Sequence, residues 1–204
     1  MNKKRELLLP IALMVTLALT RVPGVLPYNF SPVYALVFCA GVYLPKRLAL
    51  VLPLGVLFLS DVLLDLFFYP QSNFSVLTLI KYLSYAAMIC LGQRFGPKRS
   101  WLSLLGGGVL GTILFYLITN TASWLGDPGY AKTFAGWLQA LTLGLPGFPP
   151  TWTFLLKTLT SGGLFTGLFA GVMKMAEQVE SETEEETEPS AEDGEAPEAE
   201  ESKA

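Results

Sequence analysis

The chain has 204 residues, of which 51% are apolar, and its mean hydropathy is +0.46. This composition excludes an ordinary soluble domain and is typical of a protein that crosses the bilayer several times. At roughly 20 apolar residues per span, the length fits one domain of about six transmembrane helices. We therefore predict an all-α membrane protein, a six-transmembrane-helix bundle in contact with the lipid bilayer.

The net charge of −3 hides two regions of opposite charge. Residues 177–204 contain 13 acidic residues and one Lys, whereas residues 1–176 contain 13 Lys and Arg and four acidic residues. The acidic region has almost no large apolar side chains, so it cannot bury enough surface to fold alone. We predict a transmembrane domain over 1–176 and a disordered acidic tail over 177–204.

Cysteine and histidine usage argues against metal and cofactor chemistry. The chain has no His, and Cys39 and Cys90 lie in separate apolar runs. This pattern speaks against a zinc or haem site, so we expect no metal and no cofactor. The cations lie at helix ends rather than on one soluble face, which gives no support to a nucleic-acid partner.

Apolar runs predict the spans in chain order. A basic start and an apolar stretch without an Ala-x-Ala cleavage pattern indicate an uncleaved first helix over about 6–21. Later spans are predicted over about 48–68, 76–95, 101–124 and 151–175. Between the last two, Lys132 to Leu143 has apolar residues at helical spacing, which predicts an interfacial helix that could cover a pocket.

The second span is interrupted in the sequence. Val33 to Leu44 has only 12 apolar residues, so it needs the segment 28–32 to reach across the bilayer. Irregular backbone at membrane depth survives only where protein or a cavity satisfies it, which makes Asn29 and Ser31 candidate binding residues. An extracellular turn fits the same residues equally well.

The cations also predict an orientation. With the N-terminus in the cytoplasm and six spans, ten Lys and Arg residues fall on the cytoplasmic side and four on the outer side. This distribution agrees with the positive-inside rule. We therefore expect a multi-pass protein of the bacterial inner (cytoplasmic) membrane with both termini in the cytoplasm.

Seven charged or amide residues lie in or beside the apolar segments. An ionisable group at bilayer depth is costly and needs a partner, a ligand or water. On the expected topology almost all of them lie toward the outer side, which indicates a polar pocket that opens outward. The seven are Arg21, Asn29, Asp61, Asp65, Lys81, Asn120 and Lys157.

Two aspartates mark the end of the third span. Asp61 and Asp65 are four residues apart and so share one helix face. One interpretation is a site for a cation, an amine or another polar ligand. The other is that Lys81, Arg21 or Lys157 neutralises them in internal ion pairs. The two interpretations are compatible.

The fifth span carries a polar and aromatic stripe. Tyr116, Asn120 and Trp124 follow one another at intervals of four residues. Such a stripe suits stacking against a flat polar ligand that Asn120 orients by hydrogen bonds. The alternative is an Asn that packs helices together and a Trp at the membrane interface.

A search for catalytic motifs is negative. The sequence contains no Walker A motif, no His-Glu-x-x-His, no Gly-x-Ser-x-Gly and no Cys-x-x-Cys. We expect a protein that is not an enzyme, and ATP, if transport needs it, is hydrolysed by another chain. An intramembrane enzyme using Asp61 and Asp65 is the least supported class.

Three stretches resemble a bacterial family of uncharacterised transport proteins. They are Asn29-Phe30-Ser31-Pro32-Val33, Ser60-Asp61, and Phe115 to Asn120 with Trp124. That family is similar in organisation to the substrate-binding (S) components of energy-coupling-factor (ECF) transporters. The resemblance implies an S-component-like fold, a vitamin-like or other small solute, and a transmembrane coupling protein with ATPase subunits as partners.

The resulting hypothesis is an integral membrane protein that binds and takes up a small polar solute. Its substrate-binding residues would be Asn29, Ser31, Asp61, Asp65, Lys81, Tyr116, Asn120 and Trp124. The alternative is a structural or assembly protein that scaffolds partner proteins, with the acidic tail as the interacting arm.

Overall fold

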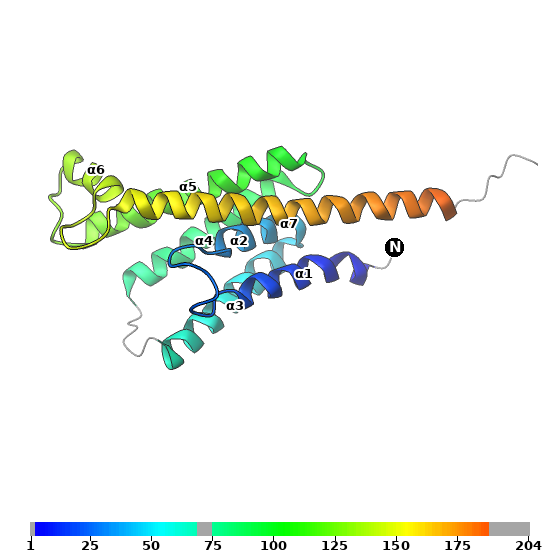
Figure 1. Cartoon of the computed structure of the whole chain (residues 1–204), viewed down its shortest axis with the longest axis horizontal. Coiled ribbons are helices and arrows are strands. Elements are labelled where there is room, and N and C mark those ends of the chain that lie inside the picture. The colour runs from blue at the N-terminus through cyan, green and yellow to red at the C-terminus, as the bar shows by residue number, and fades with distance from the viewer. Residues whose placement is uncertain (1–2, 69–74, 188–204) are drawn as a thin grey trace, which may run out of the picture.

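The structure is a computed structural model that describes residues 3–68 and 75–187. Within these ranges all regular structure is helical, so the predicted all-α class is confirmed. Figure 1 shows the helices in chain order. They are α1 (Lys3–Leu19), α2 (Val33–Tyr43), α3 (Lys46–Phe67), α4 (Val76–Phe95), α5 (Trp101–Gly126), α6 (Phe134–Thr142) and α7 (Thr151–Thr187).

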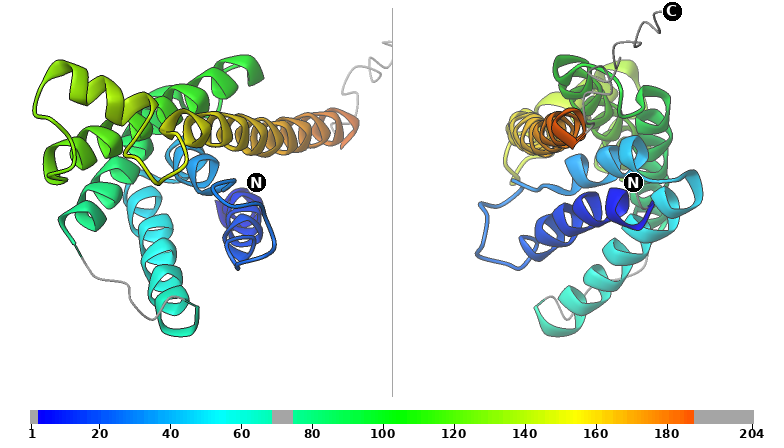
Figure 2. Two further views of the ribbon diagram at one scale, coloured as in Figure 1. Left: turned by 60° about the vertical axis from the view of Figure 1, so that its left-hand side comes forward. Right: turned by 90° about the vertical axis from the view of Figure 1, so that its right-hand side faces the viewer.

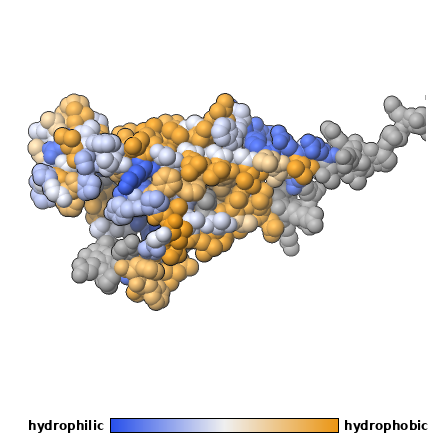
Figure 3. All heavy atoms as spheres, in the orientation of Figure 1, coloured by the Kyte–Doolittle hydropathy of each residue, from blue (hydrophilic) through white to orange (hydrophobic). Residues whose placement is uncertain are grey.

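Four of these helices are long and apolar enough to cross a membrane. They are α3, α4, α5 and α7. Many of their large apolar side chains are exposed, which is the expected state of a surface that faces lipid tails. Figure 3 shows apolar atoms over most of the visible face, with hydrophilic atoms toward the α6 end and on the acidic part of α7. These features indicate a membrane protein.

The six-span count stays a prediction. Helix α1 has 17 residues, the first of which are charged, and α2 has 11 residues. Both are shorter than the roughly 20 residues that a perpendicular span needs. The structure therefore supports four of the six predicted spans by length and composition.

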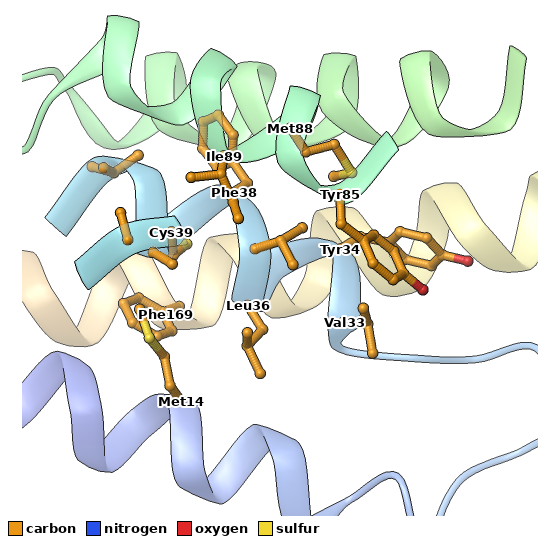
Figure 4. Close-up of a cluster of buried hydrophobic side chains, with 14 of the residues drawn as sticks. Met14, Val33, Tyr34, Leu36, Phe38, Cys39, Tyr85, Met88, Ile89 and Phe169 are labelled. Carbon is orange, nitrogen blue, oxygen red and sulfur yellow. The ribbon is translucent and has the colours of Figure 1, made fainter. Parts of the chain in front are cut away.

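The short helix α2 forms the centre of the molecule. It packs against α1, α3, α4, α5 and α7. Figure 2 shows α2 between the group of α4, α5 and α7 on one side and α1 with α3 on the other. All residues of α2 from Val33 to Val42 are buried. Figure 4 shows how its side chains meet those of α1, α4 and α7, with Phe38 and Ile89 near the middle of the cluster.

The segment that precedes α2 is not helical. Pro27 and Pro32 flank it, and Asn29 has a φ of 64°, a left-handed value that an α-helix does not accommodate. The apolar run predicted over Val33–Leu44 is present as the helix Val33–Tyr43, and the irregular segment expected at 28–32 is not helical, whereas its depth in the membrane stays a prediction. Pro32 is the N-cap residue of α2 and provides no side-chain cap, but Ser31 Oγ accepts a hydrogen bond from the Val33 amide at 3.3 Å and so satisfies one of the free amides at the helix start.

Two glycines allow α2 and α4 to pack with their backbones in contact. A Cβ atom added to Gly41 would collide with the Ile89 carbonyl, and one added to Gly92 would collide with the Phe38 carbonyl. Small residues at such a crossing bring helices close within a bilayer. This close packing explains how one short helix can be enclosed on all sides.

Local sequence signals define the other helix starts. Ser75 and Thr78 form a capping box at the start of α4. The side chains of Ser100 and Thr133 accept backbone hydrogen bonds at the starts of α5 and α6. The interfacial helix expected over Lys132–Leu143 is present as α6 (Phe134–Thr142).

Helix α7 continues beyond the predicted end of the last span. It has 37 residues, which correspond to about 55 Å of helix. Residues 177–187, predicted as part of a disordered tail, are therefore helical, and α7 projects past the other helices (Figure 1). Residues 188–204 of the predicted tail lie outside the described residues.

Candidate functional site

Asp61 is the centre of a polar cluster formed by three elements. Arg21, which follows α1, contacts Asp61 Oδ1 at 2.5 Å through Nη2. Lys81 of α4 contacts Oδ2 at 2.6 Å, and the Tyr82 hydroxyl donates to the same oxygen at 2.7 Å. Arg21 also donates to Ser60 Oγ and, at 3.3 Å, to the Leu57 carbonyl. We call Arg21, Asp61, Lys81 and Tyr82 the Asp61 cluster.

The charged side chains of the Asp61 cluster are buried to different degrees. The side chains of Arg21 and Asp61 are each 15% exposed, whereas that of Lys81 is 33% exposed. Pairing with opposite charges is what allows such groups to lie among apolar helices. Two cations share one carboxylate here, and Lys81 is the more accessible of the two cations.

Two further charged candidates, Asp65 and Lys157, are not members of the Asp61 cluster. Asp65 lies one turn farther along α3 and is partly buried. Lys157 is exposed on α7. The ion pairs at Asp61 thus match the internal-pairing interpretation for Arg21 and Lys81, while Lys157 lies outside the Asp61 cluster.

A first cavity lies between α4, α5 and the start of α7, and we call it the α4–α5 cavity. It encloses about 280 Å³. Its polar side is formed by Lys81, Thr119, Asn120 and Ser123. The remainder of its lining is apolar and consists of Leu77, Ile80, Phe115 and Phe154.

A second cavity lies along the segment before α2, and we call it the 20–32 cavity. It encloses about 490 Å³ and is lined mainly by residues of that segment, with Leu64 of α3. Arg21, Asn29 and Ser31 belong to its lining. Because Asp61 bonds both Arg21 and Lys81, it connects one wall residue of each cavity.

The three residues of the predicted α5 stripe have different environments. Asn120 lines the α4–α5 cavity and donates from Nδ2 to the Tyr116 carbonyl at 2.8 Å. Tyr116 is buried, and its hydroxyl donates to the carbonyls of Leu141 at 2.6 Å and Thr151 at 3.3 Å. Trp124 donates from Nε1 to the Ala131 carbonyl at 2.9 Å. Tyr116 and Trp124 therefore hold the segment after α5 in place.

The segment 126–150 packs on α5 rather than over the cavities. Trp137 of α6 donates to Thr121 Oγ1 at 2.9 Å, and Lys132 donates to the Trp124 carbonyl. Neither cavity is lined by any of the residues 126–150, all of which the structure describes. In this arrangement α6 is not a cover for either cavity.

Several site residues were not identified from the sequence. Tyr82 completes the Asp61 cluster, and Thr119, Ser123 and Phe154 line the α4–α5 cavity. A helical wheel of α5 could have found Thr119 and Ser123, because they are four residues apart and flank Asn120. Phe154 could not have been found in this way, since it comes from a distant part of the chain.

Aromatic rings connect the Asp61 cluster to the core. Tyr82 contacts Tyr85 edge to face at 6.0 Å between ring centroids, and Tyr85 stacks on Phe115 at 5.2 Å. Phe115 in turn contacts Tyr34 of α2 at 5.0 Å. The wall of the α4–α5 cavity is thereby fixed to the central helix.

The described residues offer no obvious place for a metal ion. Within 3–68 and 75–187, no group of three or more His, Cys, Asp or Glu side chains could hold one.

A family model matches residues 1–185 of the sequence. The chain belongs to a family of unknown function (DUF6580). The match includes most of the acidic, helical end of α7, so this part of the helix lies within the family domain. No curated protein and no solved structure matches the chain.

Proposed function

We propose that the protein binds a small polar solute within the membrane and serves its uptake. The observation that carries this proposal is that Asp61 pairs with one cation from the wall of each of two cavities, and that both cavities are lined by polar and apolar side chains. Polar groups at bilayer depth that face a cavity are characteristic of substrate pathways. A scaffold without a ligand needs the ion pairs but has no need of the cavities.

The finer features of the hypothesis belong to this proposal. They are six spans in the bacterial inner membrane, both termini in the cytoplasm and an S-component-like organisation. The partners would be a transmembrane coupling protein and its ATPase subunits. The positive-inside distribution of the cations supports the orientation. Of the candidate substrate-binding residues, those that line the cavities are Asn29, Ser31, Lys81 and Asn120, and Asp61 pairs with Lys81 beside them.

The geometry changes the expected roles of three candidates. Tyr116 and Trp124 donate to backbone carbonyls of the 126–150 segment and of Thr151, so we infer that they position this segment rather than stack on the solute. Asp65 contributes negative charge beside the Asp61 cluster.

Native mass spectrometry of the purified full-length protein tests the proposal. We expect a small molecule to remain bound to the wild-type protein and to be lost from Asn120→Leu, which removes the amide but keeps the volume. Cys90→Ser, an exposed position at the far end of α4, should retain the molecule. Absence of any bound molecule from the wild-type protein, together with unchanged uptake in Asn120→Leu, would contradict the proposal.

A further inference from the structure

The α4–α5 cavity carries enough chemistry to name the class of its ligand, an inference that rests on the proposed function. We propose that this cavity takes a small organic acid with an apolar body. The carboxylate of the acid is bound by Lys81, and an adjacent O–H or N–H group of the acid donates to hydroxyl oxygens of α5.

The charge of the cavity wall is positive. Lys81 is the charged residue among the side chains that line it. An ammonium group has three donors, and one of them is directed to Asp61 Oδ2 at 2.6 Å. Lys81, the more exposed of the two cations of the Asp61 cluster, has two further donors for a ligand. A carboxylate there forms a charge-assisted hydrogen bond, which is stronger than one between neutral groups.

A cationic ligand fits this wall poorly. No Asp or Glu occurs among the described residues that line the cavity. Asp61, the carboxylate of the Asp61 cluster, already accepts hydrogen bonds from Arg21, Lys81 and Tyr82. A second cation beside Lys81 would add repulsion without gaining a free carboxylate oxygen.

The hydroxyl groups of the wall are acceptors toward a ligand. Thr119 donates its proton to the Phe115 carbonyl at 2.9 Å, and Ser123 donates to the Thr119 carbonyl at 3.1 Å. Because a hydroxyl has one proton and two lone pairs, both oxygens can still accept. A ligand that satisfies them must carry an O–H or N–H donor close to its carboxylate.

The remaining wall selects a compact apolar body. Phe115, Phe154, Leu77 and Ile80 provide its surface. The volume of about 280 Å³ lies just below the range that suits drug-sized ligands. The ligand class is therefore a small hydroxy acid with an aromatic or branched aliphatic side chain.

Four probes of nearly equal size test this assignment on the full-length protein in phosphatidylcholine nanodiscs. Mandelate has the carboxylate and the hydroxyl, phenylacetate lacks the hydroxyl, mandelamide is neutral, and phenylglycinol is a cation. Equilibrium binding should rank mandelate first and phenylacetate second, with mandelamide roughly tenfold or more weaker than mandelate. Phenylglycinol should not bind measurably.

Two variants connect the ranking to the named residues. Lys81→Gln should weaken mandelate binding roughly tenfold or more and leave mandelamide unchanged. Thr119→Val, which keeps the shape of the side chain, should reduce the preference for mandelate over phenylacetate. Lys98→Gln, in the exposed loop after α4, removes a charge far from the cavity and should change neither result.

The outcomes separate this inference from the proposed function. Binding of phenylglycinol or mandelamide in preference to mandelate, or a co-purified molecule without an acidic group, would overturn the ligand class and leave solute binding intact. Binding of none of the probes would also overturn it. Loss of mandelate binding when phosphatidylglycerol is added would assign the cavity to a lipid phosphate instead.

Discussion

Asp61 is the carboxylate that pairs with both cations of the Asp61 cluster. It accepts from the Arg21 guanidinium after α1 and from the Lys81 ammonium and the Tyr82 hydroxyl of α4. Breaking a buried ion pair by removing one partner is more costly than never having formed it, because the remaining charge stays desolvated. Asp61 therefore stabilises the arrangement of α1, α3 and α4 as well as facing the site.

We predict that Asp61→Asn lowers the free energy of unfolding by about 2–4 kcal/mol, because Arg21 and Lys81 lose their shared counter-ion. The thermal midpoint of the full-length protein in detergent measures this loss. Glu180→Gln, an exposed position on the acidic part of α7, should leave the midpoint within experimental error. An equal, small effect of both substitutions would show that the ion pairs do not stabilise the fold.

At the residue scale, sequence reasoning found the charges but not all of their roles. An ionisable residue inside an apolar run is conspicuous, so Arg21, Asp61 and Lys81 could be predicted to converge. Tyr116 and Trp124 were assigned to ligand stacking because their spacing places them on one stripe with Asn120. Their actual partners are backbone carbonyls of the 126–150 segment and of Thr151, which side-chain spacing does not reveal.

At the element scale, the crossing of α2 and α4 is the most restrictive contact. Gly41 and Gly92 face carbonyl groups of the opposite helix, and a carbonyl in a helix cannot move aside as a flexible side chain can. A related arrangement connects α5 with α7, where Gly108 lies against Thr166 and Gly162 against Thr112. The glycine-rich sequence thus serves internal packing at these positions.

We predict that Gly41→Ala and Gly92→Ala each destabilise the protein by at least about 1–3 kcal/mol, because the added methyl group forces the two backbones apart. Gly106→Ala is the matched control, since a Cβ atom there has nothing within 4 Å and Ala favours a helix over Gly. Thermal midpoints of the three variants in one detergent give the comparison. Similar midpoints for Gly92→Ala and Gly106→Ala would contradict the close crossing.

Helix positions were predictable where apolar runs end at Pro, Gly or capping residues. The spans over 76–95, 101–124 and 48–68 correspond to α4, α5 and α3 within two residues. The enclosure of α2 was not predictable, because its uniformly apolar sequence is the same whether lipid or protein surrounds it. The helical state of residues 177–187 was missed because composition alone says nothing about a helix that continues from a preceding span.

At the scale of the whole molecule, the polar groups divide between two ends. The Asp61 cluster and α6 are associated with the ends of α1, α3 and α5 and with the starts of α4 and α7. At the opposite ends of the helices, Lys174 donates to the Pro97 carbonyl at 2.8 Å and pairs with Glu177 at 2.7 Å. An apolar surface separates these regions (Figure 3).

We predict that the α6 end faces the outside of the cell. In a background with Cys39→Ala and Cys90→Ala, a membrane-impermeant maleimide should label Phe148→Cys in intact spheroplasts, because Phe148 is 73% exposed. Lys98→Cys, in the exposed loop between α4 and α5, should react only after permeabilisation. The reverse pattern would place the cavities on the cytoplasmic side.

The position of α2 has a consequence for biogenesis. With 11 residues, or about 16 Å of helix, α2 is too short for the translocon to release it as an independent unit. Its main neighbours α4, α5 and α7 are all synthesised after it. We therefore expect α2 to become buried only after α4, α5 and α7 have been synthesised. For this part of the protein, membrane insertion then depends on tertiary assembly.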